Sequence, residues 1–128
     1  MSNIRTARRH DLNLYRQSFE LVAAGLKTIE VRVRYPRFDD MAAGDTITFH
    51  IKGTDEACDV RVLRVAEYPD FEALLDGEGT ARVNPAASRE EQLANIRAIY
   101  PPEKEALGAL AIEIELLDGQ VPAAASRL

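Results

Sequence analysis

The chain has 128 residues, of which 46% are apolar and 29% are charged, so it is long enough to bury the core of one soluble domain without disulfides. Its single cysteine, Cys58, excludes an intramolecular disulfide, and no Cys/His spacing typical of a zinc site is present. The net charge of −5 excludes a general electrostatic attraction to nucleic acid, so a site for an anion has to concentrate positive charge locally.

We expect a cytoplasmic protein that is not attached to a membrane. The N-terminal region has no apolar run of the signal-peptide type, and no stretch of the sequence is long and apolar enough to span a bilayer. Neither a phosphate-binding glycine loop nor a metal-ligand motif occurs, so the sequence predicts no cofactor and no metal. It specifies no oligomeric state.

Alternation of apolar and polar residues predicts five strands, with short helices between them. The strands cover 10–15, 27–34, 46–51, 58–67 and 109–116. The helices cover 16–25, 71–76 and 102–107, and a further helix lies between Ser88 and Pro101. Two long loops are expected over 34–45 and 77–87.

The helix ends carry recognisable capping residues. Gly25 stands where a C-terminal cap belongs, and Asp70 can cap the second helix. Ser88 and Glu91 form a capping-box signature for the helix that follows. The side chains expected on the buried face of that helix are Leu93, Ile96 and Ile99.

The fourth strand changes the phase of its apolar residues. Cys58, Val60 and Val62 keep one parity, whereas Leu63 and Val65 take the other. This change predicts a β-bulge that bends the strand, as a small barrel requires. We therefore expect an α+β domain with a mixed sheet of about five or six strands curled into a barrel, flanked by short helices. An open sheet with helices on one face is the alternative.

The strand at 27–34 carries the main candidate site. Its polar side chains share one face, because side chains alternate along a strand. They are Thr28, Glu30, Arg32 and Arg34, and Lys27 precedes them. A carboxylate can accept a hydrogen bond from the amine of a nucleobase while basic groups hold a phosphate. Alternatively, Glu30 could act as a general base beside Lys27, or the charges could form an ion-pair ladder on a solvated face.

Other polar residues have both a functional and a structural interpretation. Tyr68, at a strand end, could stack on a base or pack against the rim of the barrel. Tyr100 is expected to anchor a helix end, and Ser88 to cap a helix. His10 and His50 are interpreted as surface residues, with His50 at the margin of a cleft.

The order of these pieces resembles the ASCH domain family of the PUA-like superfamily. The segments that carry the resemblance are HDLNLY…SFELVAAGLKTIEVRV, AAGDTITF, VLRVAEYPDFEALL and IYPPEKEALGALAIEIE. The resemblance implies a PUA-like barrel, an ASCH domain over residues 10–118 and a cleft beside the strand at 27–34. The remaining residues, 1–9 and 119–128, are expected to be flexible.

The resemblance also implies binding of RNA or of a nucleoside-like or nucleotide-like ligand. Some relatives resemble amidohydrolases that act on acetylated cytidine, and others are described as ribonucleases. The amidohydrolase pattern is G-x-K-T-[IV]-T-x-R, in which Lys27 and Arg32 match this sequence. Glu30 stands in place of the catalytic threonine, which argues against a threonine-dependent mechanism.

Three functional hypotheses follow. The first is binding of RNA or a nucleotide in a cleft formed by the strand residues and Tyr68. The second is a hydrolase of acylated nucleosides, or a ribonuclease, that uses Lys27 and Glu30 as catalytic residues. The third is a non-catalytic module that binds another protein. The residues expected to bind the ligand in the first hypothesis are Lys27, Thr28, Glu30, Arg32, Arg34 and Tyr68.

Overall fold

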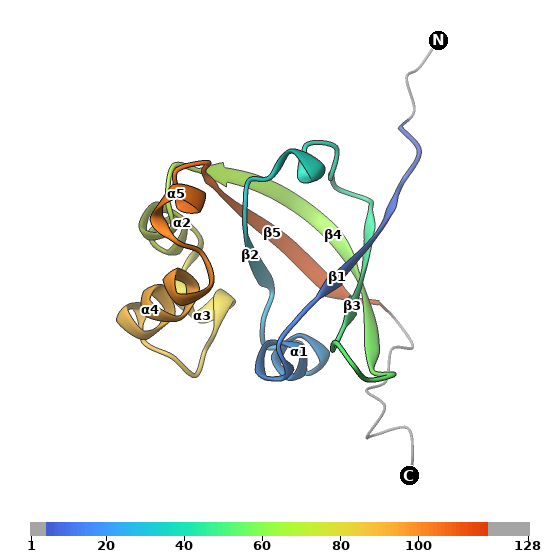
Figure 1. Ribbon diagram of the computed structural model, residues 1–128. Coiled ribbons are helices and arrows are strands. Elements are labelled where there is room, and N and C mark those ends of the chain that lie inside the picture. The colour runs from blue at the N-terminus through green and yellow to red at the C-terminus, as the bar shows by residue number, and fades with distance from the viewer. Residues whose placement is uncertain (1–4, 118–128) are drawn as a thin grey trace.

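The computed structural model describes residues 5–117, which form a curled five-stranded sheet and several short helices (Figure 1). The strands are β1 (Arg9–Asn13), β2 (Ile29–Val33), β3 (Thr46–His50), β4 (Ala57–Tyr68) and β5 (Ala109–Leu116). The helices are α1 (Arg16–Ala23), α2 (Phe71–Glu78), α3 (Thr80–Val83), α4 (Arg89–Ile99), α5 (Pro102–Glu105) and the 3-10 helix η1 (Pro36–Phe38).

The sheet is mixed, with the order β1-β3-β4-β5-β2. β1 pairs with β3 in parallel, and the other neighbouring strands are antiparallel. The register of β4 against β5 shifts between Val62 and Arg64, at the position where the sequence predicts a bulge. Leu63 is exposed at this shift. The predicted α+β fold with a curled, mixed sheet is confirmed.

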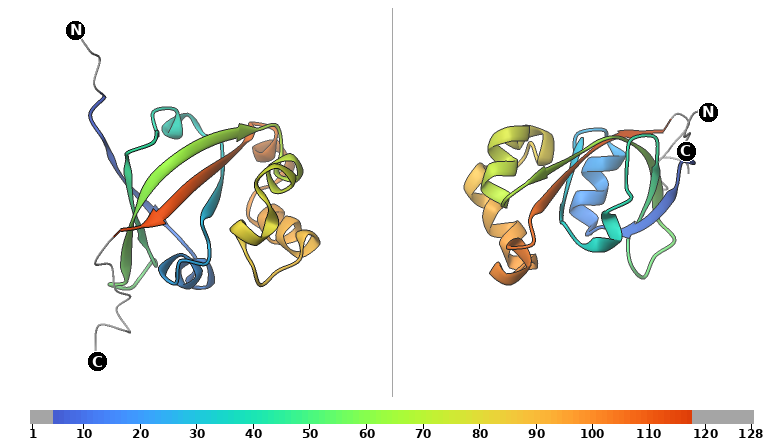
Figure 2. Two further views of the ribbon diagram at one scale, coloured as in Figure 1. Left: turned by 180° about the vertical axis from the view of Figure 1, so that it is seen from behind. Right: turned by 90° about the horizontal axis from the view of Figure 1, so that it is seen from above.

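Two apolar cores lie on opposite faces of the sheet. On the concave side, Phe19 and Val22 of α1 pack against residues of β3, β4 and β5 such as Phe49 and Ile112. On the other side, the apolar residues of β2 pack against α2, α3 and α4. Figure 2 shows α1 within the curl and the helices α2–α5 gathered beyond β2. Both faces of β2 are therefore covered.

The helix caps form as the sequence predicts. Gly25 follows α1 with φ +74°, a conformation that side chains other than glycine rarely adopt. The Asp70 carboxylate accepts a hydrogen bond from the amide of Ala73 at 2.8 Å. Ser88 and Glu91 form both hydrogen bonds of the capping box at the start of α4.

Two local predictions are wrong. The segment 77–87 is not a continuous loop, because α2 extends to Glu78 and α3 occupies Thr80–Val83. Ile99 is 50% exposed and does not join Leu93 in the core. Val83 of α3 joins the core beside β2, a tertiary contact that short-range patterns do not encode.

Asp45 fixes the turn before β3 and the chain before β1. Its fully buried carboxylate accepts hydrogen bonds from the side chains of Arg5 and His10 and from the amides of Arg8 and Ala42. Burial alone raises the pKa of this carboxyl, but these hydrogen bonds outweigh burial and hold its pKa well below the ordinary range. His10 is therefore largely covered and not a surface residue.

The termini expected to be flexible fall largely on residues that the structure does not describe. Residues 1–4 and 118–128 lie outside the described residues. Within the N-terminal segment, residues 5–8 have no regular secondary structure, yet Arg5 and Arg8 contact Asp45.

The hydrogen bonds of Asp45 make the stability of the fold dependent on pH. Because the pKa of Asp45 is lower in the folded than in the unfolded protein, its contribution is complete at neutral pH and is lost as the pH falls below about 4. We expect Asp45→Asn to lower the free energy of unfolding by about 2 kcal/mol at neutral pH. The difference between the two proteins should shrink in urea denaturation curves recorded at successively lower pH.

Asp76→Asn is the matched control, since Asp76 is an exposed carboxylate whose ion-pair partner within residues 5–117 is Arg89. It should change stability much less than Asp45→Asn. Equal, small effects of the two substitutions would contradict the role assigned to Asp45.

Candidate functional site

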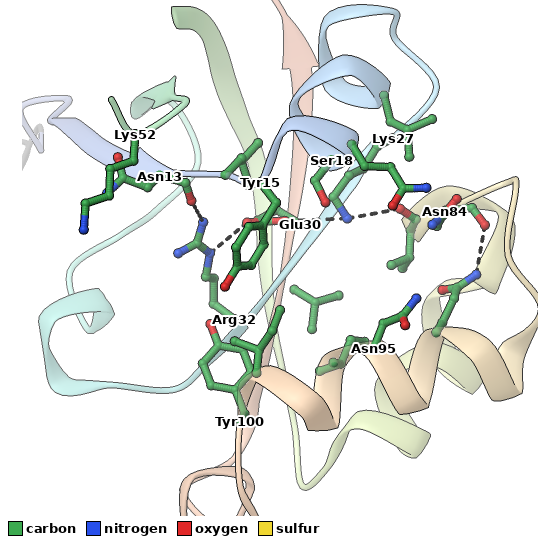
Figure 3. Close-up of a pocket in the computed structure, with 18 residues that line it drawn as sticks. Asn13, Tyr15, Ser18, Lys27, Glu30, Arg32, Lys52, Asn84, Asn95 and Tyr100 are labelled. Atoms are coloured by element: carbon green, nitrogen blue, oxygen red, sulfur yellow. Dashed lines mark hydrogen bonds and ion pairs between the residues drawn. The ribbon is translucent and has the colours of Figure 1, made fainter. Parts of the chain in front are cut away.

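β2 is an edge strand, and a pocket of about 530 Å³ lies along its free edge. One wall comes from the corner between β1 and α1, and the facing wall from α4 and the segment before it. Figure 3 shows Glu30 between Lys27 and Arg32 at the base of this space, with Tyr100 beside Arg32 and Asn95 on the α4 side. The volume falls within the range of small-molecule sites in proteins, roughly 300–1,000 Å³.

Glu30 and Arg32 of β2 form a connected cluster with Lys27, which lies just before the strand. Arg32 donates from Nε to Glu30 Oε2 at 2.7 Å, and Lys27 Nζ lies 3.6 Å from Glu30 Oε1. Lys27 also donates to the carbonyl of Val83 at 3.0 Å, and Arg32 donates to the carbonyl of Asn13 at 2.8 Å. The cluster therefore contacts both walls of the pocket through backbone carbonyls.

The cluster is buried and not solvated. Lys27 is 7% exposed and Glu30 4%, and the side chain of Arg32 is 12% exposed. The curl of the sheet turns the charged face of β2 toward the concave side, while α2, α3 and α4 cover its apolar face. The interpretation as a solvated ion-pair ladder is thus right about the pairing and wrong about the solvent.

The protonation states follow from this burial. Burial raises the pKa of Glu30, but the charges of Arg32 and Lys27 outweigh that effect, so its pKa is lowered overall. Burial lowers the pKa of Lys27, and the neighbouring carboxylate only partly opposes this. Glu30 is consequently an anion at neutral pH, a hydrogen-bond acceptor with a weak affinity for protons.

Gln92 of α4 holds the wall that faces Lys27. Its Nε2 lies 2.9 to 3.0 Å from three backbone carbonyls, those of Thr80, Asn84 and Ala87, which share its two N–H donors. These bonds fix the segment that supplies the Val83 carbonyl to Lys27. Gln92 is 3% exposed, although its sequence position resembles that of an ordinary polar residue on a helix. No sequence signal distinguishes it from a solvent-exposed glutamine.

Tyr100 combines its expected structural role with a place in the pocket. It is the C-cap of α4, and its ring lies 5.8 Å from that of Phe71 and 6.5 Å from that of Tyr35. It also lines the pocket near Arg32. Burial raises the pKa of its hydroxyl, which therefore remains protonated and able to donate a hydrogen bond.

The structure does not bring the other predicted site residues to this pocket. The Tyr68 hydroxyl donates to Glu78 at 2.6 Å, and Arg34 pairs with Glu67 at 3.1 Å in a separate surface depression. Thr28 is half-buried and is absent from the lining of the pocket.

The remaining candidates have structural partners elsewhere. His50 forms a hydrogen bond with Asp11 at 2.9 Å, and Ser88 caps α4. Within residues 5–117, no group of three or more His, Cys, Asp or Glu side chains is arranged to hold a metal ion. None of the helices in this part of the chain is long and apolar enough to cross a membrane.

Comparisons with known proteins agree with this architecture. The model of the ASCH domain matches residues 12–118, so the chain belongs to the ASCH domain family. The crystal structure of hypothetical protein PH0355 is 32% identical, with a TM-score of 0.77 over 85% of this chain and 99% of that chain. The solution structure of PF0455 from Pyrococcus furiosus is 33% identical, with a TM-score of 0.69 over 86% and 98%.

More distant structures share the fold alone. The crystal structure of ASCH from Zymomonas mobilis is 15% identical, with a TM-score of 0.61 over 88% of this chain and 68% of that chain. No curated protein matches the chain. The predicted PUA-like α+β fold of the ASCH family is confirmed.

Removal of the carboxylate at position 30 should destabilise the protein strongly. Glu30→Gln leaves Lys27 and Arg32 buried without their anion, which costs about 3–5 kcal/mol when one partner of a buried ion pair is removed. Urea denaturation at neutral pH measures this loss. Glu67→Gln is the control, because Glu67 pairs with Arg34 at the surface and its side chain is 60% exposed. Similar losses for the two variants would contradict the burial of the cluster.

Proposed function

We propose that this domain binds a nucleotide unit, free or within single-stranded RNA, in the pocket beside β2. The observation that carries the proposal is the buried cluster of two basic side chains and one carboxylate at the base of the pocket. It is a local positive site on a protein whose net charge is −5. Membership of the ASCH family supports the same class of ligand.

The groups in the pocket suit the parts of a nucleotide. An arginine has five N–H donors, and the bonds of Arg32 to Glu30 and Asn13 use two of them. Arg32 also forms a side-chain hydrogen bond with Tyr100. The remaining donors of the guanidinium can bind a phosphate or a base carbonyl. Glu30 keeps lone pairs for an exocyclic amine, and Tyr100 offers a ring for stacking and a hydroxyl for donation.

The lowered pKa of Glu30 favours ligand binding over hydrolysis as the function of the pocket. A general base works best when its pKa is close to the working pH, whereas the pKa of Glu30 is held below its ordinary value. Glu30 also replaces the threonine of the amidohydrolase pattern. Hydrolysis of acylated nucleosides or of RNA by Lys27 and Glu30 thus stays the weaker prediction, to be checked by turnover assays on acetylcytidine and RNA.

The proposal predicts a difference between two arginines of the same strand. Arg32→Gln should weaken the binding of nucleoside monophosphates and short single-stranded RNA by roughly tenfold or more, as expected for loss of a charge-assisted hydrogen bond. Arg34→Gln removes the same charge from the surface pair with Glu67 and should have little effect. Calorimetry and fluorescence anisotropy at low salt measure the affinities of both variants.

A second variant separates binding from folding. Asn95 lies exposed on α4 at the facing wall, so Asn95→Ala changes the pocket without touching the buried cluster. It should weaken binding and leave the unfolding curve unchanged. The proposal fails when no nucleotide or RNA binds at low salt, or when Arg32→Gln and Arg34→Gln weaken binding equally.

A further inference from the structure

The parallel pairing of β1 and β3 brings two unlike side chains to the rim of the pocket. Asn13 lies opposite His50 in the register, and the amide of Leu14 donates to the carbonyl of His50 at 2.9 Å. Tyr15 lies two residues after Asn13, and Lys52 lies two residues after His50. Both side chains therefore leave the sheet at the same end. Both line the pocket, with Lys52 at the end opposite Lys27 (Figure 3).

Tyr15 is held in place at its backbone and exposed at its ring. It is the N-cap of α1, and its carbonyl accepts a hydrogen bond from the amide of Phe19 at 2.9 Å. The residue is 72% exposed. Among residues 5–117, none stacks on its ring or hydrogen-bonds to its hydroxyl. Such a ring is a flat surface on which a nucleobase can stack.

Lys52 is a basic residue without an acidic partner. It is exposed, and no described carboxylate lies within ion-pair distance of its ammonium group, whereas most other basic side chains are paired. The turn that carries Lys52 is braced against α1, because Arg16 and Glu56 form an ion pair at 2.6 Å. The turn therefore places Lys52 on the same pocket rim as Tyr15, with its ammonium group available to an anion.

We propose that Tyr15 and Lys52 form a second nucleotide subsite, continuous with the pocket beside β2. A single exposed aromatic residue is ordinary in a protein surface, but this one shares a pocket rim with an unpaired cation. The next base of a single strand stacks on Tyr15, and the phosphate that joins it to the first nucleotide contacts Lys52. The inference rests on the proposed function and narrows the ligand to an oligonucleotide of at least two nucleotides.

The test compares ligands of two lengths under the same conditions. Calorimetry with nucleoside monophosphates and with the corresponding dinucleotides and trinucleotides gives the gain in affinity from the second nucleotide. We expect this gain to be roughly tenfold, as for one base stacked on an aromatic side chain. Tyr15→Ala should remove most of the gain, whereas Tyr15→Phe, which keeps the ring, should retain it.

Lys52 is tested through the salt dependence of binding. Lys52→Ala should reduce the slope of log affinity against log salt for the trinucleotide by about 0.7, the value for one phosphate contact to a single strand. Lys52→Arg keeps the charge and should preserve the slope. Because both residues are exposed, none of these variants should change the unfolding curve.

The outcomes separate this inference from the proposed function. When monophosphates bind but dinucleotides bind no more tightly, the second subsite does not exist and the proposed function stands. Equal weakening of both ligand lengths by Tyr15→Ala also overturns the subsite, because the ring then acts within the first pocket. When none of the ligands binds, the proposed function fails and the subsite fails with it.

Discussion

The arrangement of the pocket depends on one constraint, the burial of three charged side chains inside the curl of the sheet: Lys27, two residues before β2, and Glu30 and Arg32 on the strand. Removing charges from water costs several kcal/mol for each ion unless the groups are paired and hydrogen-bonded. Glu30 meets this condition by contacting both Arg32 and Lys27, and each cation finds a backbone carbonyl as a second partner. The positions of the cluster and of those carbonyls are therefore mutually dependent.

This dependence determines the shape of the site. Arg32 bonds to Asn13 at the end of β1, so it links the two edge strands of the sheet. Lys27 bonds to Val83 at the end of α3, in the segment that Gln92 holds through three carbonyls. The two walls of the pocket, far apart in the sequence, are thus positioned by the same ion cluster. A ligand that binds the cluster therefore also contacts the two pocket walls, whose separation is set by the hydrogen bonds of the cluster.

The sequence predicts those features that depend on neighbouring residues. The caps at Gly25 and Asp70 and the bulge near Leu63 are local, and the structure confirms them. Alternation along β2 correctly separates its apolar face from its charged face. It does not tell whether the charged face is exposed to solvent or buried. The curl of the sheet decides that question, and it depends on the register of strands that are distant in the sequence.

The same limit explains the residues that were misplaced or missed. Tyr68 is at a strand end, as predicted, but its hydroxyl bonds to Glu78 and its ring packs on the apolar face of the sheet, outside the pocket. Gln92 has no local signal, because its role consists of contacts to carbonyls that only the tertiary fold assembles.

Burial of charge by itself does not identify a functional site in this protein. Asp45 is as inaccessible to solvent as Glu30, yet side chains and backbone amides of its own fold surround its carboxylate with donors. Asp45 is absent from the lining of the large pocket, which Glu30 and Arg32 reach directly. A buried charge whose partners are all internal serves the fold, whereas a buried charge beside a cavity can exchange part of its partners for a ligand. By this criterion the cluster of Lys27, Glu30 and Arg32, and not Asp45, is the place where a charged ligand gains most from the field of the protein.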